Sequence, residues 1–161
     1  MDGDDPQYRL LLRHIRQLAR ALDVQSHRID REVGLTLTQL VVLTCLREMG
    51  EVTSRALSAE ADLSPPAVVG VLDKLEAKGL IERYRSARDR RIVHARLTRQ
   101  GRTALEAAPD PLGRRLGDGF RALPPGERAQ ILDALARLGR MAATDLPAAA
   151  EAGLDAPSHP A

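Results

Sequence analysis

The sequence predicts a mainly α-helical protein with one small β-hairpin. Apolar residues recur every three or four positions over most of the chain, which is the period of an amphipathic helix. Two short runs over residues 81–85 and 92–97 are separated by a charged loop, as the strands of a hairpin are. The 161 residues are enough for one compact structural unit.

The first predicted helix spans residues 6–31 and carries one long apolar stripe. The members of the stripe are three or four residues apart, so they lie on one face over about five turns. They are Leu11, Ile15, Leu18, Leu22, Gln25 and Ile29, all apolar except Gln25. The acidic residues 1–5 before this helix are predicted to be a disordered tail.

Two shorter helices are predicted to follow. The first is capped by Thr36 or Thr38 and ends near Gly50, with a largely buried apolar run between the two ends. The second is capped by Thr53, covers residues 54–61 and ends in a turn. Each cap is a hydroxyl oxygen that can accept a hydrogen bond from the first turn, so both helix starts are defined locally.

A fourth helix is predicted over residues 65–78, where Ser64 is followed by two prolines. Serine is a favoured cap, and proline is tolerated in the first turn because those backbone N–H groups have no partner within the helix. Gly79 suits the left-handed residue that follows a helix end. The third and fourth helices together are typical of a helix-turn-helix.

An antiparallel hairpin with strands over residues 81–85 and 92–97 is predicted next. Its connection, residues 86–90, is charged and too long for a two-residue turn. A hairpin placed directly after a helix-turn-helix is a wing. Residues 32–101 are therefore predicted to form a winged helix-turn-helix lobe.

Apolar residues at helical spacing predict further helices up to residue 144. Pro109 and Pro111 lie inside this segment, and an interior proline costs about 3 kcal/mol or more, so we expect a kink or a short interruption there. The last helix is predicted to begin at the Pro124-Pro125 pair. Residues 145–161 contain few large apolar groups and are predicted to be a disordered tail.

Positive charge is concentrated on the hairpin. The formal net charge of the chain is +2, but eight arginines lie between residues 81 and 102 against Glu82 and Asp89, a local charge of +6. Such a patch is typical of a nucleic-acid-binding surface. The chain has two Tyr, one Phe and no Trp, so it offers little for stacking unpaired bases. Double-stranded DNA is therefore the predicted partner.

The second helix of a helix-turn-helix enters the major groove, and here that helix covers residues 65–78. Val68, Leu72 and Leu75 are needed for the core, which turns the opposite face outward. The predicted DNA-binding residues of this helix are Ser64, Pro65, Pro66, Val69, Gly70 and Lys74. Proline and valine can contact thymine methyl groups but cannot hydrogen-bond to base edges, so we expect weak direct readout.

The wing is expected to supply much of the affinity through Arg85, Arg88, Asp89, Arg90 and Arg91. Arg88 and Arg90 lie at the tip, where they can enter a minor groove that concentrates negative potential. Asp89 is the acidic exception, and we expect its carboxylate to hold the Arg91 guanidinium in a fixed orientation. The alternative is a solvated basic hairpin with no partner.

One pattern of residues joins the wing to the helix that follows it. It consists of Asp89-x-Arg91, then five residues, then Leu97-Thr98-x-x-Gly101, preceded by matching segments over residues 63–68 and 72–83. This pattern resembles the signature of the MarR family (multiple antibiotic resistance regulators). The resemblance implies a homodimer with two winged lobes on a palindromic operator. It further implies a repressor that releases the operator when a small, often phenolic, effector binds.

Apolar stripes at the two ends of the chain support a dimer independently of that resemblance. In so small a chain they have no obvious third layer to pack against, and a partner chain would cover them. We therefore expect residues 6–31 and 102–144 to form N- and C-terminal dimerisation helices. The predicted interface residues are Leu11, Ile15, Leu18, Leu132, Leu135 and Leu138.

Other function classes find little support in the sequence. No G-x-S-x-G, phosphate-binding Gly loop or H-E-x-x-H motif occurs, so we expect no enzyme and no cofactor. The four His lack metal-ligand spacing, and His94 is expected at the surface. Cys45 lies among apolar residues and is expected to be a buried structural residue rather than an oxidant sensor.

The predicted location is the cytoplasm, because the N-terminus lacks a secretory signal and no apolar run is long enough to span a membrane. The sequence does not identify effector-binding residues. The remaining alternative is an architectural or weakly specific winged-helix protein that binds DNA without an effector. A ratio of specific to non-specific DNA affinity separates the two.

Overall fold

The computed structural model describes residues 5–143. In chain order its elements are α1 (Pro6–Val33), α2 (Leu37–Met49), β1 (Val52–Thr53), α3 (Ser54–Ala61), α4 (Pro65–Ala77), β2 (Ile81–Arg85), β3 (Val93–Leu97), α5 (Arg99–Ala107), α6 (Arg114–Ala122) and α7 (Pro125–Ala143). The predicted fold class, mainly α-helical with a small β-wing, is confirmed. No helix among these residues is long and apolar enough to cross a membrane.

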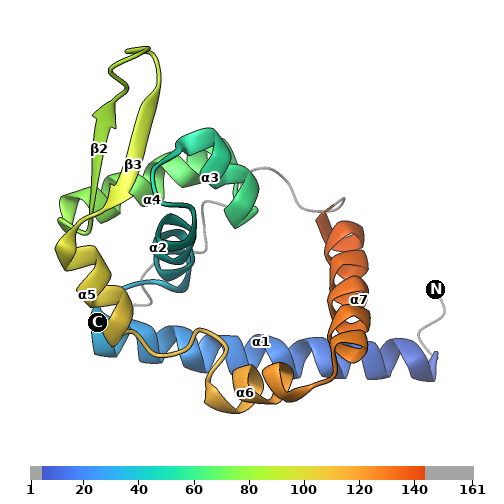
Figure 1. The fold of residues 1–161 in the computed structure, drawn as a ribbon. Coiled ribbons are helices and arrows are strands. Elements are labelled where there is room, and N and C mark those ends of the chain that lie inside the picture. The colour runs from blue at the N-terminus through green and yellow to red at the C-terminus, as the bar shows by residue number, and fades with distance from the viewer. Residues whose placement is uncertain (1–4, 144–161) are drawn as a thin grey trace, which may run out of the picture.

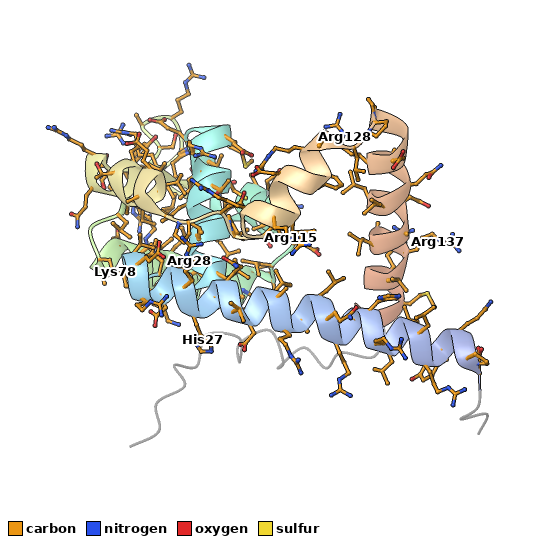
Figure 2. The ribbon with its side chains drawn as sticks, turned by 90° about the horizontal axis from the view of Figure 1, so that it is seen from below. His27, Arg28, Lys78, Arg115, Arg128 and Arg137 are labelled. Atoms are coloured by element: carbon orange, nitrogen blue, oxygen red, sulfur yellow. The ribbon has the colours of Figure 1, made fainter. Side chains whose placement is uncertain are left out.

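A lobe and a set of protruding helices make up the molecule (Figure 1). Helices α2, α3 and α4 and the hairpin β2–β3 gather over the C-terminal end of α1, and the hairpin projects away from α1. The N-terminal half of α1 extends beyond the lobe, and α7 stands away from the lobe in both views (Figures 1 and 2). We call the lobe "the winged lobe" and the protruding helices α1, α6 and α7 "the arms".

The apolar core lies in the winged lobe. Its largest fully buried side chains are Ile29, Leu35, Leu40, Leu43, Leu46, Leu57, Leu72, Leu75, Val42 and Val68. Helix α1 contributes only Ile29 as a buried residue, although it is 28 residues long. The core of the winged lobe therefore includes Ile29 near the C-terminal end of α1, and the rest of α1 contributes no buried residue.

Side-chain caps define the helix starts, as the sequence predicts. The Thr53 and Ser64 hydroxyls accept hydrogen bonds from Ala56 N and Ala67 N at 3.2 and 3.4 Å. Of the two alternatives for α2, Thr36 is the cap, and it forms a reciprocal capping box with Gln39. The predicted tail 1–5 is one residue too long, because Asp5 caps α1; residues 1–4 lie outside the described residues.

The end of α4 follows the prediction made from Gly79. This glycine has φ +70°, a left-handed conformation that glycine adopts without steric cost. Gly79 N donates to Glu76 O at 2.8 Å and Leu80 N donates to Leu75 O at 3.0 Å, which is the Schellman pattern. The chain therefore reverses sharply, and β2 begins close to the end of α4.

The sheet contains one strand that the sequence did not reveal. Strand β1 pairs antiparallel with β3, with Val52 opposite Ala95, so the strand order is β1-β3-β2. A strand of two residues is too short to show alternation, which is why it was not predicted. Its pairing attaches the base of the wing to the start of α3.

The predicted interruption after α5 is confirmed. Helix α5 ends at Ala107 and α6 begins at Arg114, with Pro109 and Pro111 in the connection. Gly113 ends the connection at φ +75° and lies against α1, since a Cβ there would meet the Gln25 side chain at 2.8 Å. The predicted tail over residues 145–161 lies outside the described residues.

Candidate DNA-binding surface

Helix α4 buries one face and exposes the other. Val68, Leu72 and Leu75 are buried as predicted, and Val71 joins them. On the opposite face Pro65, Pro66, Val69, Gly70 and Lys74 are exposed, whereas Ser64 is half-buried because its hydroxyl is the α4 cap. A Cβ built on Gly70 would meet nothing within 4 Å, so this face is open at its centre. The structure thus leaves five of the six predicted residues accessible.

Arg83 on β2 pairs with two acidic residues of α4 and partly offsets their charge. Its guanidinium lies 2.6 Å from an oxygen of Asp73 and 2.6 Å from an oxygen of Glu76. The backbone N–H of Arg83 also donates to Glu76 at 3.2 Å. These hydrogen bonds from Arg83 are the main reason why the pKa of Glu76 is lowered. The contact ties the exposed helix to the wing and offsets negative charge on the face predicted to meet DNA.

The wing tip is held by hydrogen bonds to its own backbone. The Ser86 hydroxyl accepts from the backbone N–H groups of Arg88 and Asp89 at 3.2 and 3.4 Å. Arg85 donates from its guanidinium to the carbonyl of Arg90 at 2.8 Å. The tip therefore has a defined turn, although all its side chains from Ala87 to Arg91 are exposed.

Asp89 does not hold the Arg91 guanidinium, so that prediction is wrong. Its carboxylate instead accepts a hydrogen bond from the backbone N–H of Arg91 at 2.9 Å. Aspartate commonly accepts from the backbone two residues ahead, because its short side chain reaches that N–H in a turn. Asp89 therefore fixes the path of the backbone and leaves the Arg91 side chain to other partners.

The arginines of the hairpin fall into two groups. At the base, Arg96 pairs with Glu82 at 2.5 Å and with Glu51 at 3.2 Å, just as Arg83 pairs with the acids of α4. At the tip, Arg88, Arg90 and Arg91 have no acidic partner within residues 5–143. The predicted local charge of +6 is thus unevenly available: Arg88, Arg90 and Arg91 are accessible at the tip, and Arg99 and Arg102 are exposed on α5.

Tyr84 and His94 form a stacked pair beside Arg96. Their ring centroids are 5.6 Å apart, and the Arg96 guanidinium carbon lies 5.1 Å from the Tyr84 centroid. The hydrogen bond from the Tyr84 hydroxyl is the largest cause of a lowered pKa of Glu51. His94 is half-buried in this pair, which corrects its prediction as a surface residue. Tyr84 and His94 lie opposite each other on β2 and β3, and this pairing cannot be predicted from their order in the chain.

The pattern over residues 89–101 has a structural explanation at its C-terminal end. Thr98 donates from its hydroxyl to Gly79 O at 2.7 Å and accepts from Gly101 N at 3.0 Å. A Cβ at Gly101 would overlap the Leu80 carbonyl oxygen. These two residues let the start of α5 pack against the end of α4. The two ends of the hairpin are therefore held next to each other.

The arms expose the predicted dimer residues. Leu11, Ile15 and Leu18 of α1 are 37%, 47% and 43% exposed, and Leu132 and Leu135 of α7 are 55% and 49% exposed. Leu138 is half-buried. In the winged lobe, leucines with the same helical spacing are fully buried. The arms therefore present large apolar side chains that nothing else within residues 5–143 covers.

Cys45 is buried within α2, as expected. It is 9% exposed, and its burial is the main reason why the thiol pKa is raised. A raised pKa leaves little reactive thiolate at neutral pH. The structure therefore supports a packing role for this cysteine.

The winged lobe has the architecture of a winged-helix DNA-binding protein, with an open-faced helix beside a hairpin that carries accessible arginines. Comparison with known proteins agrees. The family model described as "MarR family" matches residues 35–93, which run from the start of α2 into β3. The chain belongs to the MarR family of DNA-binding transcriptional regulators.

Two relatives from Bacillus subtilis (strain 168) are named as HTH-type transcriptional regulators. YkoM is 31% identical over 127 residues, which cover 77% of this chain and 82% of YkoM. YdgJ is 31% identical over 105 residues, which cover 65% of this chain and 64% of YdgJ.

A solved structure of Bordetella bronchiseptica BpsR has a TM-score of 0.61 with this chain at 30% identity. The match covers 83% of this chain and 98% of that protein. The structure is described as showing how 6-hydroxynicotinic acid regulates DNA binding by BpsR.

Proposed function

We propose that this regulator is a homodimeric repressor that binds a palindromic operator and releases it when a small effector binds. The observation that carries the proposal is the division of the chain into two surfaces. The winged lobe combines the open face of α4 with unpaired arginines at the wing tip, and the arms expose the apolar residues of α1 and α7.

In the proposed complex, α4 of each chain lies in a major groove and the wing follows the neighbouring minor groove. A symmetric dimer places two identical helices on half-sites about one helical turn, roughly 34 Å, apart. Arg88 and Arg90 extend from the tip, where a narrow groove concentrates negative potential. Arg83 and Arg96 each bind two carboxylates, so they hold elements of the lobe together but contribute little long-range attraction to DNA.

The dimer is proposed from the exposed apolar residues of the arms. A symmetric interface would place α1 and α7 against the same helices of a second chain and cover Leu11, Ile15, Leu18, Leu132 and Leu135. Leu138, which is half-buried, lies on the same predicted face.

The effector response is proposed by analogy. The match with BpsR extends over nearly the full length of BpsR, and a small aromatic acid regulates DNA binding by that protein. A small aromatic or phenolic anion is the corresponding proposal here. Because two rigid heads must match a fixed DNA repeat, a shift of a few ångströms between them would be enough to release the operator.

An architectural, weakly specific DNA-binding role is the second candidate. It is favoured by the composition of the α4 face, where Pro65, Pro66, Val69 and Gly70 carry no hydrogen-bonding side chain for base edges. Such a protein would bind through the wing arginines alone and show little preference among sequences.

The test is selection of genomic fragments by the purified full chain. The best fragment and a scrambled duplex are then titrated at two salt concentrations. A preference of about a thousandfold or more for a palindromic fragment supports the regulator. Equal affinity for both duplexes, with a steep salt dependence, supports the architectural role.

A further inference from the structure

We propose that Lys78 is a positioning residue that fixes the direction of the recognition helix α4 relative to the arm α1. The proposal rests on the proposed function, since it concerns how two lobes are held at the spacing of a DNA site. Lys78 is the C-cap residue of α4 and lies beside the C-terminal end of α1 (Figure 2).

The Lys78 ammonium is already occupied by two oxygens of the protein. Its Nζ donates to the carbonyl of Gly34 at 2.6 Å and to the side-chain oxygen of Gln39 at 3.2 Å. Gly34 is the left-handed cap that ends α1. The first contact therefore joins the end of α4 directly to the end of α1, across 44 residues of sequence.

Gln39 extends the joint to a third helix. It is 3% exposed, and its side-chain oxygen also accepts a hydrogen bond from Thr36 N at 3.2 Å in the α2 capping box. One buried amide oxygen thus serves the start of α2 and the lysine at the end of α4. We call Lys78, Gln39 and Gly34 "the Lys78 joint".

Electrostatics favour a cation at this place. The carbonyl groups at the C-terminal end of a helix carry partial negative charge, and Lys78 meets that end of α1 while belonging to the same end of α4. A hydrogen bond from an ammonium to a carbonyl is also stronger than one between neutral groups. The joint therefore uses the charge of Lys78 for contacts within the chain rather than for phosphate.

Small changes at this joint are amplified along α1. The helix has 28 residues and is about 42 Å long at about 1.5 Å per residue. A rotation of about 5° at its C-terminal end moves its other end by roughly 4 Å over that length. Apart from Lys78, this angle is held by the buried Ile29, by the partly buried Val33 and by the packing of Gly113 against Gln25.

The experiment compares Lys78→Met with Lys74→Met in the full chain. Methionine keeps most of the side-chain length and removes the ammonium at both positions. Lys74 lies one turn earlier on the exposed face of α4 and is the matched control for a residue facing DNA. Each variant is titrated with the selected operator and the scrambled duplex over a range of salt, and circular dichroism checks its fold.

For Lys78→Met we expect a loss of operator affinity of up to about tenfold at an unchanged salt slope, because losing a hydrogen bond from a charged group lowers the population of the binding-competent orientation. Binding to the scrambled duplex stays unchanged. A phosphate-contacting lysine would instead lower the slope by about 1 per chain. Wild-type affinity, or a slope lowered in Lys78→Met as in a phosphate contact, would overturn the proposal.

A measurement without DNA separates failure of the joint from failure of the proposed function. Spin labels at Arg55→Cys in a Cys45→Ala background report the distance between the two lobes of a dimer. We expect Lys78→Met to broaden this distance distribution and Lys74→Met to leave it unchanged. An unchanged distribution in Lys78→Met would contradict the joint, whereas the absence of any distance between chains in the parent protein would contradict the proposed dimer.

Discussion

The same helical spacing of apolar residues is buried in the winged lobe and exposed in the arms. In the winged lobe Leu40 and Leu72 are 1% and 0% exposed, whereas in the arms Leu132 and Leu135 are 55% and 49% exposed. All four belong to helices with apolar residues at helical spacing. The period therefore defines which face of a helix is apolar, but not whether the same chain covers that face. The lobe, together with Ile29 of α1, buries its apolar faces, whereas those of α1 and α7 stay exposed within residues 5–143.

The largest expected effect separates these two regions directly. Leu72→Ala removes a fully buried side chain and should lower the free energy of unfolding by about 2–5 kcal/mol, measured by urea denaturation.

Leu135→Glu should separate the proposed dimer in sedimentation velocity and abolish operator binding while the lobe stays folded by circular dichroism. A Leu135→Glu protein that remains dimeric would place the interface elsewhere.

The next comparison is between the tip and the base of the wing. Arg90→Ala removes an unpaired cation and should weaken operator binding by about 1–3 kcal/mol with a shallower salt slope. Arg96→Ala removes a cation that Glu51 and Glu82 already neutralise, so the salt slope should stay close to wild type. Equal slopes for Arg90→Ala and the wild type would remove the tip from the DNA interface.

Asp89 offers a smaller and more selective test of the tip. Asp89→Asn keeps an oxygen that can accept from Arg91 N, so its operator affinity should stay near that of the wild type. Asp89→Ala loses this hydrogen bond and should weaken binding by about 1 kcal/mol. If both variants weaken equally in fluorescence titrations, the negative charge of Asp89 matters rather than its hold on the backbone.

The smallest expected effect is a pH dependence at the contact between α4 and the wing. The pKa of Glu76 is lowered from 4.5 in the folded protein, chiefly by hydrogen bonds from Arg83, so the charged carboxylate stabilises the fold above that value. This stabilisation is lost as the pH falls below about 4.5 through the folded pKa. Because Glu76 is partly exposed, its size should be under about 1 kcal/mol.

Glu76→Gln should therefore flatten the acid side of the stability profile in urea titrations. Asp62→Asn, at an exposed acid outside this contact, is the control and should leave the profile as it is. An unchanged acid slope in Glu76→Gln would show that its pair with Arg83 adds no stability.

Features that depend on neighbouring residues could be predicted from the sequence. The caps at Thr53 and Ser64, the reversal at Gly79 and the break at Pro109 follow from side chains that act within a few residues. The inward face of α4 was also predicted, because it needs only the helical period.

Contacts between distant segments could not be predicted. Strand β1 exists only through its pairing with β3, and Lys78 reaches a carbonyl 44 residues earlier. At Asp89 the partner residue, Arg91, was predicted correctly, but the wrong group was chosen, because Arg91 offers both a backbone N–H and a guanidinium. Only the backbone geometry of the turn decides between the two.

Sedimentation equilibrium of the full chain, alone and with the selected operator duplex, tests the central claim most directly. We expect a mass of two chains in free solution and of two chains per duplex in the complex, because the arms complete each other while each lobe occupies one half-site. A single chain in solution that binds the duplex one to one with full specificity would contradict the account.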